Sequence, residues 1–285
     1  MYRRKAIVLF SILSFAIVSI SISSCSNPIN IFSDADDIKL GKQIDEEIRK
    51  DPKQYPLLKN RPDINKYVEE IGKKILSSPA ITKRGTYAYQ FEIIKDDSTI
   101  NAFCTPGGYI YVYTGLLKFV ENEATFAGVI GHEIAHAERR HATRRITAAY
   151  GVQIALGLVL GQNPAKAAEI TANLFTGLGF LANSRSDETE ADEYSFKYLS
   201  TSEYYPGGIR YFFDKIGAEG KRGGGGFERL LSTHPLPKDR VDHVMDLLAQ
   251  SGNPPATDAN LFTSRYRTFK EIGRASCRER VYVLV

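Results

Sequence analysis

The stretch Gly131-His132-Glu133-Ile134-Ala135-His136 carries an HExxH pattern inside a segment that is predicted to be one helix from about residue 122 to 150. Helix positions four apart share a face, so the imidazoles of His132 and His136 can reach one metal ion. Glu133 lies about 100° away around the helix and can face a water molecule beside that ion. These spacings are typical of zinc hydrolases. The pattern also occurs by chance, so the rest of the chain must supply further ligands.

A catalytic zinc site needs a third protein ligand and an open position. The metzincin pattern requires glycine at position 139 and histidine at position 142, where this chain has Arg139 and Ala142, so that class is excluded. Glu188 and Asp192 lie one turn apart on a predicted helix from about residue 183 to 199. Glu188 can be a carboxylate ligand, and Asp192 can accept a hydrogen bond from a ligand imidazole. An acidic run is equally typical of a solvated helix surface.

Two residues near these segments are assigned no metal role. His141 comes five residues after His136, beyond the metal-facing position, and is expected to pair or pack on the helix flank. Cys104, beside a predicted edge strand, is expected to be a small buried residue rather than a nucleophile.

The hydrophobic pattern of the whole chain predicts a mostly helical protein with one small sheet just before the HExxH segment. Gly107, Gly108 and Tyr109 mark either a plain hairpin turn or an approach to an edge strand that is open to an extended peptide. Helices are expected at about residues 34–50, 62–77, 206–216 and 239–250, and strands at about residues 87–94, 99–103 and 109–113.

Residues 146–160 and 166–180 form two runs rich in Ala, Gly and Leu, each about 15 residues long and too short for an ordinary membrane span. They are suited to a helical hairpin. Such helices are usually core elements, and the alternative is a partly exposed hairpin that touches a membrane or covers the active site.

The chain begins with the features of a bacterial lipoprotein. The positively charged Arg3-Arg4-Lys5 precedes an apolar stretch from residue 6 to 22, and Ile22-Ser23-Ser24-Cys25 closes it. This pattern resembles a signal with a lipobox, in which the leader is removed and Cys25 carries the lipid. An uncleaved signal anchor is the alternative. The serine after Cys25 suits sorting to the outer membrane of a Gram-negative cell.

Composition argues for a globular chain without a nucleic-acid partner. The hydrophobic fraction is 43%, and the formal charge is +4. Without the leader and the last 15 residues, 31 basic and 31 acidic residues remain. Nucleic-acid binding therefore has no electrostatic support. Residues 271–285 resemble the translation of a sequencing-adaptor read-through and are left out of the fold reasoning.

The combination of His132-Glu133-x-x-His136 with Glu188-x-x-Ala191-Asp192 resembles the M48 family of zinc peptidases, a group of gluzincins. Similarity extends from about residue 36 to 248, and the apparent lack of several membrane spans favours the small periplasmic lipoproteins of the family without tetratricopeptide repeats. Further segments are similar to the family's edge-strand region and C-terminal motif, namely Asn101-Ala102-Phe103, Pro106-Gly107-Gly108-Tyr109-Ile110, Thr114-Gly115-Leu116-Leu117, and Ser232-Thr233-His234-Pro235 followed by Arg240.

The resemblance implies an α+β, mostly helical, zincin-like metalloprotease domain with a small mixed sheet whose edge strand flanks the active-site helix. It implies one zinc ion per subunit, with His132, His136 and Glu188 as ligands. Glu133 is then the general base that accepts a proton from water.

Three more positions receive roles from the resemblance. Asp192 is expected to orient a ligand histidine, and Arg240 to stabilise a carbonyl or pair with an acidic residue. His234 is expected to take a fourth metal position at rest or to lie near the oxyanion, with an ordinary turn histidine as the alternative. The substrate is expected to pair with the edge-strand segment that contains Gly107, Gly108 and Tyr109.

The implied function is zinc-dependent hydrolysis of peptide bonds in misfolded or unassembled cell-envelope proteins by a lipid-anchored, periplasm-facing enzyme. The alternative is an envelope chaperone or assembly factor whose metal site is latched by His234. The expected organisation is a signal peptide (1–24), a tether (25–35), an M48-type peptidase domain (36–250), a C-terminal extension (251–270) and a non-native tail (271–285).

Overall fold

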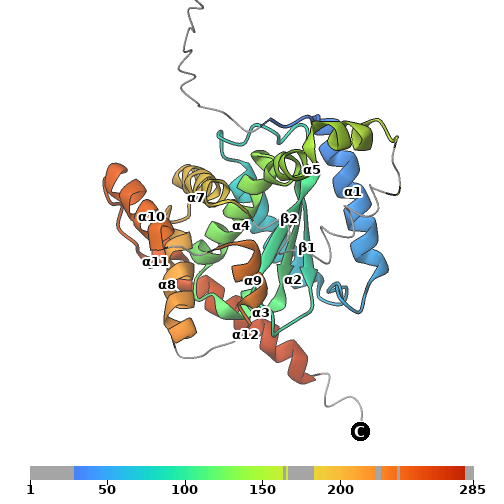
Figure 1. Ribbon diagram of the computed structural model, residues 1–285. Helices are drawn as coiled ribbons and strands as arrows, with labels where there is room; N and C mark the ends of the chain where they lie inside the picture. The colour runs from blue at the N-terminus through green and yellow to red at the C-terminus, as the bar shows by residue number, and fades with distance from the viewer. Residues whose placement is uncertain (1–28, 163–164, 166–182, 222–225, 236–237, 280–285) are drawn as a thin grey trace, which may run out of the picture.

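The structure is a computed structural model that describes residues 29–162, 165, 183–221, 226–235 and 238–279. It confirms a mostly helical α+β fold with a small sheet (Figure 1). The first half contains α1 (Asp34–Lys50), α2 (Pro62–Leu76), β1 (Gln90–Ile94), β2 (Ala102–Thr105), the 3-10 helix η1 (Pro106–Gly108), β3 (Tyr109–Tyr113), α3 (Thr114–Phe119) and α4 (Glu123–Glu138). The second half contains α5 (His141–Val159), α7 (Arg185–Ser200), α8 (Gly208–Lys221), α9 (Glu228–Thr233), α10 (Lys238–Gln250), α11 (Asp258–Leu261) and α12 (Thr263–Glu279).

The three strands lie in the order β1-β3-β2, with β1 parallel and β2 antiparallel to the central β3. All of β3 is buried, because alternate side chains point to opposite faces and both faces are covered. Ile110 and Val112 face the main core around α4, whereas Tyr109, Tyr111 and Tyr113 pack with α1 residues. The sheet is therefore mixed, and its edge strand β2 lies against α4.

The structure corrects the position of the substrate edge at Gly107, Gly108 and Tyr109. Gly107 and Gly108 form the η1 turn with φ angles of +77° and +93°, a region that favours glycine. Tyr109 begins the central strand β3, which is paired on both sides. Among the described residues β2 pairs with β3 alone, so β2 is the edge that remains open beside α4.

Helix α4 runs through the middle of the molecule (Figure 1), and all of its residues are buried. It packs against α7 and α8 and, on another side, against β2. Glycines allow the close crossing with α8, since a Cβ at Gly208 would lie 2.1 Å from the Ala124 carbonyl oxygen. The Asn122 side chain caps α4 by accepting a hydrogen bond from the Thr125 N–H at 2.8 Å. Burial on every side holds the HExxH residues in rigid surroundings.

The prediction of one helix from residue 122 to 150 is wrong, because the chain breaks between α4 and α5. Arg140 at the break has a left-handed conformation with φ of 59°, which is uncommon for a residue other than glycine. Its guanidinium is 2.6 Å from Asp37 Oδ2 of α1, and it donates to the Phe32 carbonyl at 2.5 Å. These contacts from a distant segment stabilise the turn.

The predicted helices near residues 34–50 and 62–77 are confirmed. Ser33 and Asp36 form a capping box that begins α1. Pro62 occupies the first position of α2, where its missing N–H costs no helical hydrogen bond. A capping box therefore sets the start of α1, and a proline at the first helical position sets the start of α2.

The C-terminal extension contains α11 and α12, which were not predicted. The Tyr266 side chain is fully buried and donates to the Leu117 carbonyl at 2.7 Å. Arg265 pairs with Glu123 in the first turn of α4. The start of α12 therefore packs on the same core as α4. Helix α12 continues through Glu279 into the segment that was left out as non-native.

Among the residues that the structure describes, none of the helices is both long enough and apolar enough to cross a membrane. Helix α5 covers most of the first predicted hairpin run and leaves Val152, Leu156 and nearby Leu160 about half exposed. The second run at 166–180, the signal peptide at 1–24 and Cys25 lie outside the described residues.

Candidate metal centre

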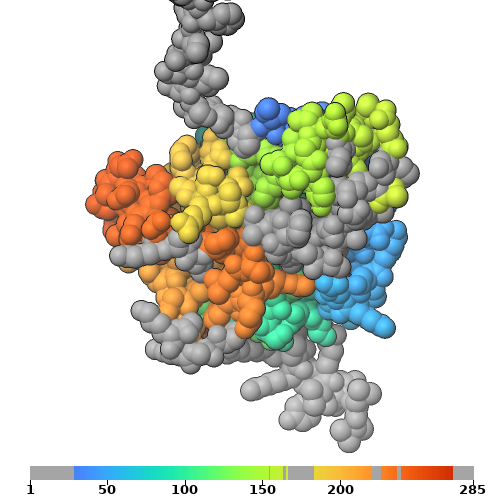
Figure 2. Space-filling view, viewed as in Figure 1, coloured from blue at the N-terminus to red at the C-terminus, as the bar shows by residue number. Residues whose placement is uncertain are grey.

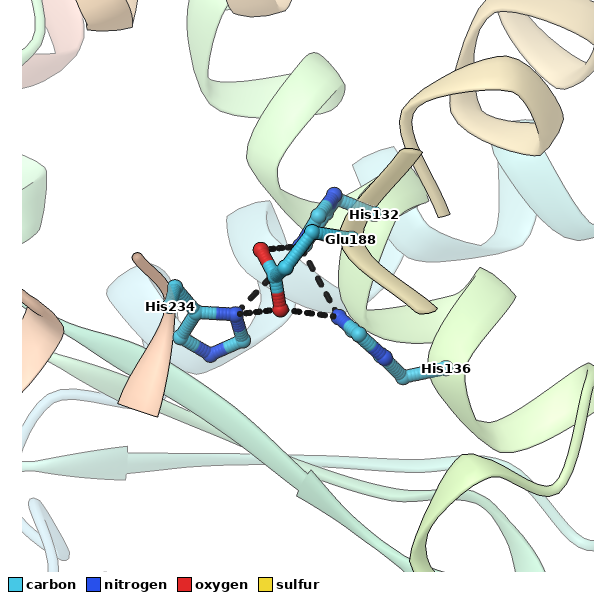
Figure 3. A group of neighbouring side chains, drawn as sticks. All are labelled: His132, His136, Glu188 and His234. Atoms are coloured by element: carbon cyan, nitrogen blue, oxygen red, sulfur yellow. Dashed lines mark hydrogen bonds and ion pairs between the residues drawn. The ribbon is translucent and has the colours of Figure 1, made fainter. Parts of the chain in front are cut away.

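Four side chains meet beside α4. His132 and His136 project from this helix, Glu188 comes from α7, and His234 directly follows α9. Figure 3 shows that their polar ends point toward one another, and one donor atom of each lies within 4.8 Å of the others. All four are at most 5% exposed. The fold thus joins the two motif histidines to residues from two distant segments.

The Glu188 carboxylate occupies the middle of this group. Its Oε2 atom is 3.3 Å from His132 Nε2, and its Oε1 atom is 3.3 Å from His136 Nε2 and 2.9 Å from His234 Nδ1. The Nε2 atoms of His132 and His136 are 2.9 Å apart. Glu133 lies beside the group, with its Oε1 atom 3.6 Å from His234 Nε2.

Asp192 and Arg240 form a buried support behind the group. His132 Nδ1 is 2.8 Å from Asp192 Oδ1, while Arg240 donates to both Asp192 oxygens at 2.7 Å. Arg240 Nη1 is also 2.6 Å from Glu188 Oε2. Burial opposes ionisation of Asp192, but Arg240 outweighs it and holds the pKa of this carboxyl below its usual range. Arg240 is therefore a partner of acidic residues, the second of its two predicted roles.

His136 has a support of its own that the sequence analysis missed. His136 Nδ1 is 2.5 Å from His141 Nδ1, and His141 Nε2 is 2.9 Å from Glu190 Oε2. The Glu190 carboxylate accepts the Nε2 proton of His141, which leaves His141 Nδ1 free to accept the Nδ1 proton of His136. Burial lowers the pKa of His141, which keeps this imidazole neutral. A histidine five positions after HExxH was the only sequence signal for this contact.

The donor set fits a zinc ion. With their Nδ1 protons given to Asp192 and His141, the imidazoles of His132 and His136 can turn both Nε2 lone pairs to one point. Burial opposes a charge on His132, but the carboxylates of Glu188 and Asp192 outweigh it and raise the pKa of His132 to about 9. Burial lowers the pKa of His136 well below its usual range. The group thus attracts a cation, and two imidazoles with one carboxylate are a donor set that zinc prefers.

Asn183 is another site residue that the sequence gave no reason to select. Its amide Nδ2 is 3.3 Å from His136 Nε2 and 3.2 Å from His234 Nδ1, and its Oδ1 accepts a hydrogen bond from Arg145 Nη1. Asn183 precedes α7, and its backbone N–H donates to the Thr233 carbonyl at 3.1 Å. This amide therefore connects the metal-binding group with Arg145 on α5.

A cavity of about 90 Å³ opens beside the group. Glu133 reaches it from α4, and β2 forms one wall. Cys104 also lines the cavity, where it is partly exposed rather than buried as predicted. Desolvation raises the pKa of its thiol, which argues against a nucleophile. The remaining walls include both apolar and polar side chains, namely Ile44, Ile48, Tyr55, Phe103, Asn183, Arg145 and His234.

Comparison with known proteins identifies the family. The model of peptidase family M48 matches residues 62–248, which include α4, α7 and most of α10. The chain is 31% identical over 191 residues to a putative beta-barrel assembly-enhancing protease of Vibrio cholerae, covering 64% of this chain and 38% of that protein. It is 38% identical over 161 residues to the mitochondrial metalloendopeptidase OMA1 of Arabidopsis thaliana, covering 56% of this chain and 31% of that protein.

The Escherichia coli metalloprotease LoiP is 29% identical over 179 residues, which are 58% of this chain and 64% of LoiP. The chain spans less than two-fifths of the length of the first two relatives, 38% and 31% respectively. Because the family model covers more than half of the sequence and includes every residue of the buried group, the chain belongs to peptidase family M48, whose members are zinc metallopeptidases.

Proposed function

We propose that this protein is a zinc-dependent endopeptidase. The observation that carries the proposal is the meeting of His132, His136 and Glu188 beside a cavity that Glu133 also lines. A buried three-ligand set next to a carboxylate and an accessible space is the arrangement required for metal-assisted hydrolysis of a peptide bond.

His132, His136 and Glu188 are the proposed zinc ligands. A zinc ion held there supplies a Lewis acid that polarises a peptide carbonyl and lowers the pKa of water. Asp192 orients His132 at 2.8 Å, while His141 orients His136 at 2.5 Å. These contacts keep both ligand imidazoles in one tautomer and one orientation.

Glu133 is the proposed general base. Its side chain is 2% exposed, and burial raises the pKa of its carboxyl. A carboxylate with a raised pKa accepts a proton from the attacking water more readily and can then donate it to the leaving amine. His234, with its Nε2 atom 3.6 Å from Glu133 Oε1, lies where it can donate to the developing oxyanion.

The proposed substrates are misfolded or unassembled proteins of the cell envelope. An extended segment of such a protein can add to the open edge of β2, whose residues Phe103, Cys104 and Thr105 line the cavity beside Glu133. Relatives named as beta-barrel assembly-enhancing proteases support an envelope role. The lipobox at Cys25 supports lipid anchoring, with the enzyme facing the periplasm from the outer membrane.

A second candidate function is an envelope chaperone or assembly factor with a latched site. His234 Nδ1 is 2.9 Å from Glu188 Oε1 and 3.4 Å from His132 Nε2, so His234 completes a set of four donors. Four protein donors close a zinc site, whereas hydrolysis requires an open position. In this candidate the protein keeps its metal and fold but cleaves weakly or not at all.

Cleavage of an unfolded protein separates the two candidates. The zinc-loaded chain is compared with Glu133→Gln, which is expected to bind zinc equally and to lower the cleavage rate by about 10²–10⁴-fold. Asp246→Asn, on the exposed part of α10, is the control for loss of one carboxylate. Cleavage that survives Glu133→Gln unchanged would refute the peptidase proposal, and wild-type protein that binds zinc without cleaving would favour the chaperone.

A further inference from the structure

Arg145 on α5 is a partly buried cation, with its side chain 21% exposed, that the metal-binding group does not use. It lines the cavity with Glu133, His136 and Asn183. Among the described residues that line this cavity, Arg145 is the sole lysine or arginine and Glu133 the sole carboxylate. A guanidinium in such a place requires a counter-charge, because burial without a partner is costly.

Within the part of the chain that the structure describes, the carboxylates near Arg145 already have other partners. Glu190 contacts Arg139 at 2.7 Å and Arg144 at 2.9 Å, and it also accepts from His141. Three described guanidinium groups, including that of Arg145, therefore share two described carboxylates, those of Glu190 and Asp187. Figure 2 shows α5, which carries Arg144 and Arg145, and α7, which carries Asp187 and Glu190, side by side at the surface.

Of the three arginines, Arg145 lies farthest from the oxygens of Asp187 and Glu190. Its Nη1 atom is 3.9 Å from Asp187 Oδ2, while Arg144 contacts Asp187 Oδ1 at 3.0 Å. The Nε atom of Arg145 is buried and has no hydrogen-bond partner within the described part of the chain. Burial lowers the pKa of the Arg145 guanidinium, in keeping with an under-compensated cation. Counted over the described residues, these groups leave one positive charge in excess, and Arg145, which has the longest of these ion-pair distances, borders the cavity.

The position of Arg145 relates this charge to the reaction centre. Asn183 Oδ1 accepts a hydrogen bond from Arg145, and the same amide group lies 3.3 Å from His136 Nε2 through its Nδ2 atom. Only one side chain therefore separates the guanidinium from the metal-binding group. A substrate whose scissile bond lies at Glu133 would bring a neighbouring side chain to Arg145.

We infer that Arg145 forms an anion-binding subsite that selects peptides with an acidic residue within two positions of the scissile bond. The inference rests on the proposed peptidase function and adds a substrate class to it. A planar guanidinium can bind a Glu or Asp carboxylate with two parallel hydrogen bonds, whereas the uncharged amide of Gln or Asn gives weaker contacts.

Matched peptides test the subsite. Cleavage sites are first located in an unfolded protein by mass spectrometry, and peptide pairs are then made that differ only by Glu or Gln at each position within two residues of the bond. We expect kcat/KM of the wild type to favour Glu at one position by about tenfold or more. The Glu to Gln ratio is expected to fall to about one in Arg145→Gln and to be partly kept in Arg145→Lys.

Controls separate the subsite from other causes. Arg185→Gln removes one positive charge from an exposed position of α7 outside the cavity, and it is expected to keep the wild-type ratio. Zinc content and thermal unfolding identify any variant that fails to fold. A wild-type ratio near one at every position overturns the inference. An equal loss for Glu and Gln peptides in Arg145→Gln does so as well, since it would show carbonyl binding or a structural role.

Failure of the peptidase proposal is recognised independently. If the wild type cleaves neither member of a pair, binding of the same labelled peptides to wild type and Arg145→Gln is measured by fluorescence anisotropy. Tighter binding of the Glu peptide to the wild type alone supports the subsite in a non-cleaving protein. Equal binding of both peptides rejects it.

Discussion

His136 Nδ1 lies 2.5 Å from His141 Nδ1, although the two residues belong to different helices. A continuous helix would rotate position 141 nearly half a turn away from the face that His136 occupies. The left-handed turn at Arg140 redirects the chain, so that His141 becomes the first residue of α5 and faces back to α4. The break between the helices therefore produces a support for a proposed zinc ligand.

The first prediction concerns this support. His141→Ala is expected to weaken zinc binding by about 10–100-fold, since His136 loses the acceptor for its Nδ1 proton. His141→Gln is expected to recover part of the loss, because an amide oxygen can accept the same proton. Competition with a chelator measures the affinity. His243→Ala on α10 is the matched control, and an effect of His141→Ala no larger than that of the control would contradict the proposed support.

The second prediction concerns the latch. If His234 holds a fourth position at rest, His234→Ala should retain zinc but show one imidazole fewer around the metal. X-ray absorption spectroscopy of the zinc-loaded protein measures this number. Cleavage of an unfolded protein is expected to rise if opening limits the rate, and to fall if His234 stabilises the oxyanion instead. Unchanged zinc coordination would remove the latch from consideration.

The third prediction concerns the buried pair of Arg240 and Asp192. Asp192 has no solvent exposure, so Arg240→Ala removes both guanidinium contacts from a carboxylate in the core and leaves it only His132 as a charged partner. The free energy of unfolding is expected to fall by about 3–5 kcal/mol. Urea unfolding of the chelated protein measures the change without a contribution from zinc. Arg185→Ala, at an exposed position of α7, is expected to change stability by less than about 0.5 kcal/mol.

The fourth prediction concerns acid stability. Asp96 accepts hydrogen bonds from the Ser98 hydroxyl at 2.6 Å, the Ser98 N–H at 2.9 Å and the Thr99 hydroxyl at 2.6 Å. The Ser98 hydroxyl is the largest cause that lowers the pKa of this carboxyl. A depressed folded pKa stabilises the protein above the unfolded pKa of about 3.9, and that stability is lost as the pH falls through the folded value.

Asp96→Asn should therefore lower the free energy of unfolding by about 1 kcal/mol at pH 7. The difference from wild type is expected to begin to shrink as the pH falls below about 4 and to be smallest below the lowered folded pKa of Asp96, where both proteins carry an uncharged side chain. Chemical unfolding across this pH range measures the difference. A constant difference would show that the hydrogen bonds do not depend on the charge of Asp96.

The sequence alone located the chemistry that depends on local geometry. His132, Glu133 and His136 are placed by the pitch of one helix, and the start of α1 at Asp34 is set by a capping box within four residues. Glu188 and Asp192 were selected as a pair one turn apart, and the family resemblance added His234 and Arg240. These inferences require short spacings or a known motif, and neither depends on how distant segments pack.

Tertiary structure decided the features that depend on segments far apart in the chain. The order of the strands made β2 rather than β3 the open edge, because alternation of side chains does not encode which strand lies in the middle. The break at Arg140 is stabilised by Asp37, a residue of α1. The positions of Asn183 and Arg145 beside the metal-binding group depend on how α4, α5 and α7 pack against one another. Such contacts are set by packing between helices, and no local propensity of the residues specifies them.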